Sequence, residues 1–184
     1  RRQDQSRAGR LALERGSLRL HAAAASGDVA AIRNLAKAGE KLDARDGNGR
    51  TPLHLAAFRG DADAIRALIA AGADPGLLEN QRYDAVTIVA VSDDVSALKA
   101  LLALGASAKL TTSRYDGTAL IAAAHLGHDG IVRELIAAGA PLDHVNNLGW
   151  TALIEAVILG DGGKRHVETV RALLAAGANR NLAD

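Results

Sequence analysis

The chain has 184 residues, of which 48% are hydrophobic and 2% aromatic, so its core must consist of alanine and branched aliphatic side chains. Its 22 basic residues nearly balance its 21 acidic residues, and a net charge of +1 gives no general attraction for nucleic acid. The absence of cysteine excludes disulfides, thiolate catalysis and cysteine-ligated zinc, and no apolar run approaches the roughly 18 residues of a membrane span.

Residues 1–16 form a polar, arginine-rich lead whose apolar side chains cluster only at positions 11–13. We expect this lead to be partly disordered and to cap the first repeat with a turn of helix. A basic arm for an acidic partner is the functional alternative to a solubilising terminus. The chain lacks methionine and begins with two arginines, which predicts a processed or trimmed piece of a longer product.

Residues 51–72 predict two short helices joined by a glycine turn. Thr51 can cap the first helix through its hydroxyl, and Pro52 suits the first helical position because it has no N–H to satisfy. Gly60 permits the turn with a positive φ, and Gly72 ends the second helix. Both helices are shorter than the roughly 12–15 residues that an isolated helix needs, so the unit requires neighbours.

The same pattern of leucine, alanine and glycine recurs along the chain at a period of 33 or 34 residues, with one insertion in the last copy. Two-helix units at this period predict a single all-α solenoid domain in which each repeat contacts its neighbours. We expect that domain at residues 17–184, with repeats at about 17–49, 50–82, 83–116, 117–149 and 150–184.

Residues 51–57 read Thr-Pro-Leu-His-Leu-Ala-Ala, and with this motif and the matching period the chain resembles the ankyrin repeat family. The resemblance implies an all-α repeat solenoid of about five helix-turn-helix units joined by β-hairpin finger loops. It also implies a concave binding face made by the fingers and the first helices. The third unit has Asp84 in place of the threonine and can still be capped. The histidine bonds that the family makes between repeats are expected at His54 and His21.

The four segments between repeats, at residues 43–50, 76–83, 110–117 and 143–150, are rich in turn-forming residues and predict the fingers. Three of the four aromatic residues lie in or beside them, and tyrosine, tryptophan and arginine are enriched in interface hot spots. The competing interpretation is that Tyr83 and Trp150 pack between adjacent fingers. We expect the arginines to pair with partner carboxylates and the aromatic residues to be anchors. The predicted contact residues are Arg45, Asn48, Arg50, Phe58, Arg59, Arg82, Tyr83, Arg114, Tyr115, His125, Leu126 and Trp150.

Residues 160–166, Gly-Asp-Gly-Gly-Lys-Arg-His, are expected to lengthen the turn between the last two helices by five residues. Their spacing fits neither a P-loop nor a dinucleotide motif, so we expect a contact loop or a neutral insertion. His125 and His128 lie beside Asp129 and could suggest a metal site. A structural role, in which His128 caps the turn, is the favoured interpretation.

These observations predict a non-catalytic module that binds another protein on its concave face, without cofactor, metal, nucleic acid or membrane span. The alternatives are an inhibitor or immunity protein of a specific enzyme and an accessory of a periplasmic antioxidant enzyme. An alternative from another class is a small-molecule or metal-dependent enzyme around His125, His128 and residues 160–166. Residues 115–128 and 143–163 are also similar to a group of often exported bacterial ankyrin proteins, which implies the periplasm, with the cytoplasm as alternative.

The last helix has no polar replacement on the face where a sixth repeat would stack. Terminal repeats normally carry a polar outer face, so we expect the last repeat to be uncapped. A further repeat, a second copy of the chain or a partner would then cover it.

Overall fold

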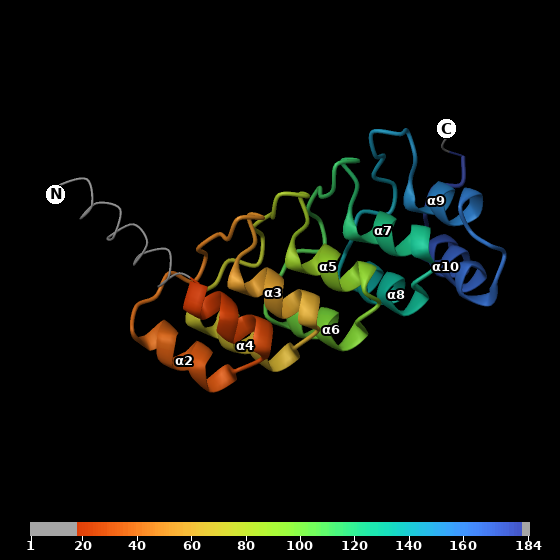
Figure 1. Ribbon diagram of the computed structural model, residues 1–184. Coiled ribbons are helices and arrows are strands. Elements are labelled where there is room, and N and C mark those ends of the chain that lie inside the picture. Colours follow the sequence, from red (N-terminus) through yellow and green to blue (C-terminus); the bar gives the residue numbers. More distant parts are fainter. Residues whose placement is uncertain (1–17, 182–184) are drawn as a thin grey trace.

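The computed structural model describes residues 18–181 as helix pairs stacked one after another along the molecule (Figure 1). Residues 18–26 are helical, and they are followed by α2 (Val29–Lys37), α3 (Pro52–Arg59), α4 (Ala62–Ala71), α5 (Ala85–Val91), α6 (Val95–Ala103), α7 (Ala119–Leu126), α8 (Asp129–Ala137), α9 (Ala152–Ile158) and α10 (Lys164–Ala175). The predicted all-α repeat solenoid is confirmed. None of the helices described combines the length and hydropathy needed to cross a membrane.

The helices form two rows with a row of loops beside them. The first helices of successive repeats, α3, α5, α7 and α9, contact one another in that order, and so do the second helices α2, α4, α6, α8 and α10. In Figure 1 the inter-repeat loops project beyond the first helices, on the side away from the second helices. The molecule therefore has a loop side and a second-helix side.

Helix starts are fixed by the local chemistry that the sequence predicts. The Thr51 side chain accepts a hydrogen bond from the backbone N–H of His54, and the His54 ring accepts one in return from the Thr51 N–H at 2.9 Å. Asp84 takes the place of threonine at the next first helix and accepts from the Thr87 N–H, also at 2.9 Å. The reciprocal pair at Thr51 and the single bond at Asp84 satisfy backbone donors that a helix start otherwise leaves free.

His54 also joins repeats, as expected. Its Nε2 donates to the carbonyl oxygens of Leu77 at 2.8 Å and Tyr83 at 3.1 Å. Burial lowers the pKa of His54, which keeps the ring neutral and lets one nitrogen accept while the other donates. The Nε2 of His21 lies 2.8 Å from the carbonyl oxygen of Arg50 in the same way.

His128 does not have the predicted role. We expected its side chain to cap the turn, but its Nδ1 donates to the carbonyl oxygen of Ala90 in the preceding repeat at 2.9 Å. His128 occupies the N-cap position of α8, but its side chain makes no capping hydrogen bond there, so the prediction that it caps the turn is wrong for the side chain. His128 nevertheless has a structural role, because this bond to Ala90 joins the fourth repeat to the third.

The core runs continuously between the two helix rows. Leucine and isoleucine of the second helices and alanine of the first helices form one buried cluster, in which Leu68, Leu101 and Leu135 occupy the same position of successive repeats and are fully buried. Burying one such side chain contributes roughly 1.5–3 kcal/mol. Because the first helices present alanine at their contacts, their backbones can approach closely.

The fingers are tight turns rather than two-stranded ladders. Each is closed by a backbone hydrogen bond across its base, for example from the Glu79 N–H to the Tyr83 carbonyl. Within residues 18–181, bridge pairing is limited to an isolated antiparallel bridge between Thr112 and Gly117. Neighbouring fingers are joined by backbone bonds such as Ser113 N–H to Arg82 O at 2.8 Å and Asn147 N–H to Tyr115 O at 2.8 Å. The fingers therefore form one connected row.

The insertion in the last repeat is only partly loop. Lys164, Arg165 and His166 belong to α10, which has 12 residues against 9 in α8. The expectation that residues 160–166 lengthen only the turn is thus wrong. Residues 159–163 form the connection, and the remaining insertion adds a turn to the helix.

Candidate protein-binding surface

A groove of about 280 Å³ lies between the finger row and the first helices α5 and α7. It receives side chains from three consecutive repeats. The residues that line it are Tyr83, Thr87, Val91, Thr112, Ser113, Tyr115, Gly117, Thr118, Ile121, Ala122, His125, Leu126, Asn146 and Glu155.

Four of the predicted contact residues, Tyr83, Tyr115, His125 and Leu126, line this groove together. Tyr115 is 50% exposed and Leu126 is 40% exposed, although both are large apolar side chains. Tyr83 is half-buried and packs against the core. The groove thus presents open apolar surface on a floor fixed to the core.

One end of the groove is polar because of Glu155 on α9, a residue that our sequence interpretation missed. Its Oε1 accepts from Asn146 Nδ2 at 3.0 Å, and its Oε2 accepts from His125 Nδ1 at 2.9 Å. Glu155 is buried and occupies the position that Leu55 and Ile88 fill in earlier repeats. A carboxylate in an otherwise apolar column was the signal that could have revealed it, because a buried charge needs partners.

The floor of the groove is rigidly connected to a finger. The hydroxyls of Thr87 on α5 and Thr112 at the finger base lie 2.9 Å apart, and both side chains are buried. This bond holds the finger at a fixed distance from the helix row.

The finger arginines are engaged within the protein. Arg45 donates to the carbonyl oxygen of Leu78 in the next finger at 2.6 Å, Arg82 pairs with Asp116 at 2.7 Å, and Arg114 donates to Gln81 at 2.6 Å. Each of these contacts joins two neighbouring fingers. Their visible role is to connect the finger row, and pairing with a partner's carboxylates stays a prediction.

Arg50 is held inside its own finger by Asp46, with Nε 3.0 Å from the carboxylate. Burial alone would raise the pKa of Asp46, but hydrogen bonds from the backbone N–H groups of Arg50 and Asn48 and from the Arg50 side chain outweigh it, so the pKa is lowered. The carboxylate therefore stays ionised and keeps this finger closed.

The other predicted contact residues lie outside the groove. Phe58 and Arg59 are exposed at the end of α3, and Arg59 donates to the carbonyl oxygen of Ala25 at 3.3 Å. Trp150 is half-buried at a finger base. The predicted residues beyond the groove are Arg45, Asn48, Arg50, Phe58, Arg59, Arg82, Arg114 and Trp150.

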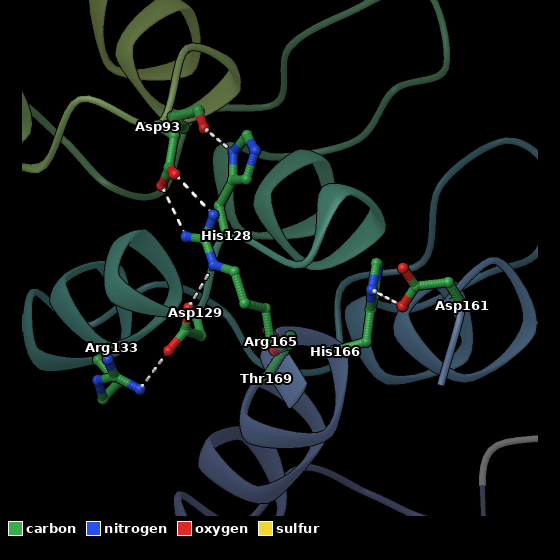
Figure 2. A network of polar contacts seen from close by, with 9 residues as sticks. Asp93, His128, Asp129, Arg133, Asp161, Arg165, His166 and Thr169 are labelled. Atoms are coloured by element: carbon green, nitrogen blue, oxygen red, sulfur yellow. Dashed lines mark hydrogen bonds and ion pairs between the residues drawn. The ribbon is translucent and has the colours of Figure 1, made fainter. Parts of the chain in front are cut away.

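The insertion contributes a polar network near the turns of the third and fourth repeats (Figure 2). Arg165 makes two bonds to Asp93, at 2.8 and 3.1 Å, and a third to Asp129 at 2.9 Å. Asp129 also pairs with Arg133 at 3.0 Å. The Arg165 side chain therefore joins the fifth repeat to the fourth and to the third.

Arg165 changes the titration of the acids around it. The hydrogen bonds from Arg165 are the largest influence on Asp93 and lower its pKa. Burial alone would raise the pKa of Asp129, but the bonds from Arg165 and Arg133 outweigh it and the pKa is lowered. Asp93, Asp129 and Arg165 therefore all stay charged through the neutral pH range.

The histidines of the alternative metal site have separate partners. His125 is bonded to Glu155 and His128 to the Ala90 carbonyl. His166 donates from Nε2 to the carbonyl oxygen of His125 at 3.0 Å, and its Nδ1 lies 3.0 Å from Asp161. Among the residues from 18 to 181, no group of three or more His, Cys, Asp and Glu side chains could hold a metal ion.

Comparison with known proteins gives a consistent result. Family models described as ankyrin repeats match residues 20–69, in the form with many copies, and 85–184, in the form with three copies. A solved ankyrin repeat domain from Acinetobacter baumannii AYE is 45% identical with a TM-score of 0.82, covering 90% of this chain and 84% of that chain. The solved ankyrin repeat protein EF0377 is 31% identical with a TM-score of 0.84, covering 91% of this chain and 85% of that chain.

A shorter match exists to YahD of Escherichia coli (strain K12), a protein named for ankyrin repeats. It is 40% identical over 73 residues, which are 39% of this chain and 36% of YahD. The alignment thus spans little more than a third of the curated relative.

Proposed function

The chain belongs to the ankyrin repeat family, and we propose that it binds another protein in the groove between its fingers and first helices. Proteins built from these repeats are generally non-catalytic interaction modules. The proposal goes further because it assigns the interaction to the groove at Tyr115 and Leu126. The partner is a protein segment with an apolar side chain that enters the groove.

The observation that carries the proposal is the convergence of exposed apolar side chains from successive repeats on one preformed groove. Tyr115 comes from a finger and Leu126 from the end of α7, and both border the same space. Large apolar side chains left open beside a fixed polar group are typical of interface centres. The Glu155 and His125 pair provides that polar group.

Non-catalytic binding is supported by the way in which the polar side chains of the groove are used. Both carboxylate oxygens of Glu155 accept internal hydrogen bonds, and the Thr87 and Thr112 hydroxyls bond to each other. A general acid or base must be able to reach substrate. These groups instead hold the walls of the groove in place.

The experiment that tests the proposal is capture of partners from a lysate of the source cells with Tyr115→Ala and Leu126→Ala. Each truncation removes an exposed apolar side chain, so we expect captured partner to fall at least tenfold in the double variant, the size typical of a hot spot of about 1.4 kcal/mol or more. Thermal stability should stay close to that of the parent. Phe58→Ala is the matched control, because Phe58 occupies the position of His125 on α3 and is exposed outside the groove.

Retention of the same partner by the double variant, with loss in Phe58→Ala, would move the interface to the N-terminal repeats. An enzyme among the captured proteins distinguishes the two runner-up roles. Inhibition of that enzyme by this chain supports an inhibitor or immunity protein, whereas increased activity or stability supports an accessory.

Two finer proposals accompany the main one. Resemblance to exported bacterial ankyrin proteins supports a periplasmic location, which fractionation of the source cells would test.

Exposed Val157 and Leu174 on the last repeat support self-association at that end. Sedimentation of the chain over a range of concentrations would test it, and a monomer at all concentrations would contradict it.

A further inference from the structure

A second groove lies on the second-helix side, away from the fingers. It has a volume of about 440 Å³ and runs between α2 and α4. Its walls are Arg33 and Lys37 of α2 and Arg66 of α4, and its floor consists of alanine: Ala36, Ala67, Ala70 and Ala71. Alanine has no side chain beyond Cβ, so a ligand's backbone can approach the floor between the basic side chains.

The charge of this groove is poorly compensated. The segment Val29–Lys37 contains two basic residues and no acidic one. In the part of the chain that the structure describes, neither the exposed Arg33 nor the exposed Lys37 has a side-chain hydrogen bond or ion pair. Arg66 has a partner, Asp63 at 3.0 Å, but both side chains are more than half exposed and such a pair is weak.

Comparison with the other repeats shows that this arrangement is particular to the first. Arg33 begins a column in which every second helix has a basic residue, and the other members are paired with acids: Arg66 with Asp63, Lys99 with Glu134, Arg133 with Asp129 and Arg171 with Glu168. The position of Lys37 is alanine in the other repeats: Ala70, Ala103, Ala137 and Ala175. The first repeat thus has an additional cation and lacks the compensating acid.

The N-terminal part of the sequence also has an excess of positive charge. Residues 1–50 contain 11 of the 22 basic residues but only 6 of the 21 acidic ones. The near-neutral total therefore conceals a basic N-terminal part and an acidic remainder. A groove in the basic part selects for negative ligands through the local field.

We propose that the groove between α2 and α4 binds an acidic segment of a partner protein, with its carboxylates on Arg33 and Lys37 and its backbone over the alanines. Arginine can hold a carboxylate with two parallel bonds, and lysine adds a second point of charge. Arg33 and Lys37 are four residues apart on α2, with Cβ atoms roughly 5–6 Å apart, so two neighbouring carboxylates of one segment can reach both of them. This surface is separate from the finger groove, and either assignment can fail without the other.

Charge also decides between possible occupants. Residues 1–17 of this chain contain five arginines and only two acidic residues, so their charge has the same sign as that of the groove and does not complement it. Nucleic acid binding usually neutralises several phosphates along a basic face, whereas the unpaired cations here are concentrated on α2. An acidic protein segment matches two or three cations better than a polyanion does.

The test is a fluorescence anisotropy titration of the 184-residue chain with a labelled peptide that has glutamate pairs separated by alanines. We expect saturable binding at 50 mM salt that weakens as salt rises, and little binding of the same peptide with glutamine in place of glutamate. Arg33→Gln with Lys37→Gln should weaken binding at least tenfold. Arg133→Gln with Arg171→Gln is the control, because it removes the same charge from the same helix row and should change binding less than twofold.

The variants should fold, because all four positions are exposed and glutamine has a helix propensity close to that of lysine and arginine. Amide chemical-shift changes in the parent provide a readout that needs no variant, and they should centre on α2 and α4. Equal loss in both double variants would overturn the proposal by showing a nonspecific charge effect. Absence of binding at 50 mM salt, or tighter binding of an oligonucleotide or of phosphatidylserine vesicles with the same dependence on Arg33 and Lys37, would overturn it as well.

Discussion

Asp93 has a left-handed backbone conformation, and glycine occupies the corresponding position in other repeats. Its φ is 59°, and Gly27, Gly60 and Gly127 have φ between 68° and 72° at the corresponding turns. A residue with a Cβ is less stable there by roughly 1 kcal/mol, although aspartate tolerates the region better than most. The carboxylate gained in exchange accepts both bonds from Arg165. The same residue therefore brings both the backbone strain and the ion pair with Arg165, and the second offsets the first.

Replacing Asp93 with glycine separates these two effects. The substitution relieves backbone strain but removes a pair in which Arg165 is about half exposed, and exposed pairs are worth roughly 0.2–1 kcal/mol and weaken with salt. We expect Asp93→Gly to match the parent within about 0.5 kcal/mol at low salt. At 1 M NaCl it should be more stable than the parent, because salt screens the pair and leaves the strain relief unchanged.

Urea unfolding at the two salt concentrations measures this difference. Asp93→Asn is the control, because asparagine keeps a similar backbone tolerance and loses the charge. It should be less stable than the parent at low salt and nearly equal to it at high salt. A glycine variant that is less stable than the parent at both concentrations would contradict the interpretation.

Single residues were predictable from the sequence where their chemistry is local. The caps at Thr51 and Asp84 involve backbone groups three residues away, so the sequence alone indicates them. The bond from His128 to Ala90 spans 38 residues, and that from Arg165 to Asp93 spans 72. Neither partner is apparent until the repeats are stacked, and the same holds for Glu155 and His125.

At the scale of elements, the second helices owe their stability to leucine positions shared with the neighbouring repeats. Leu101 of α6 is fully buried in the continuous core, between helices α4 and α8 that both contact α6. Leu174 of α10 is 37% exposed. The same truncation therefore leaves a closed cavity at Leu101, whereas at Leu174 part of the side chain is already in contact with solvent.

We expect Leu101→Ala to lower the free energy of unfolding by about 2–5 kcal/mol, the usual cost of a buried leucine. Leu174→Ala should cost less, about 1–2 kcal/mol, because part of the side chain is already in water. Chemical denaturation of both variants provides the comparison. Equal costs would mean that Leu101 does not lie in the shared core.

The start of α10 was not predictable from local signals. Residues 160–163 read Gly-Asp-Gly-Gly, which favours a loop, and Gly163 at the N-cap has no side chain with which to cap the helix. Tertiary contacts hold the additional turn instead, through Arg165 to Asp93 and Asp129 and through His166 to the His125 carbonyl. These contacts with distant residues stabilise a helical turn that the local sequence does not favour.

Across the whole molecule, the last repeat that the structure describes is not equivalent to the middle of the stack. Ala57, Ala90 and Ala124 are fully buried by the following repeat, whereas Val157 at the same position of the last first helix is 61% exposed. In a solenoid, stability is approximately the sum of repeat and interface contributions. Helices with a neighbour on one side therefore open at lower free energy than those with neighbours on both.

Amide hydrogen exchange measures this gradient directly. We expect the slowest exchange in α5 to α8 and faster exchange in α9 and α10, because local opening needs less energy where fewer apolar contacts are lost.

Arg165 opposes the opening of α10 through its bonds to Asp93 and Asp129, which lie in the third and fourth repeats. Those exposed pairs are screened by salt. Raising the salt concentration should therefore speed exchange in α10 more than in α6, and Arg165→Gln should remove most of that salt effect. Exchange that is uniform along the stack, or a salt effect that survives Arg165→Gln, would show that the pairs do not couple the last repeat to the interior.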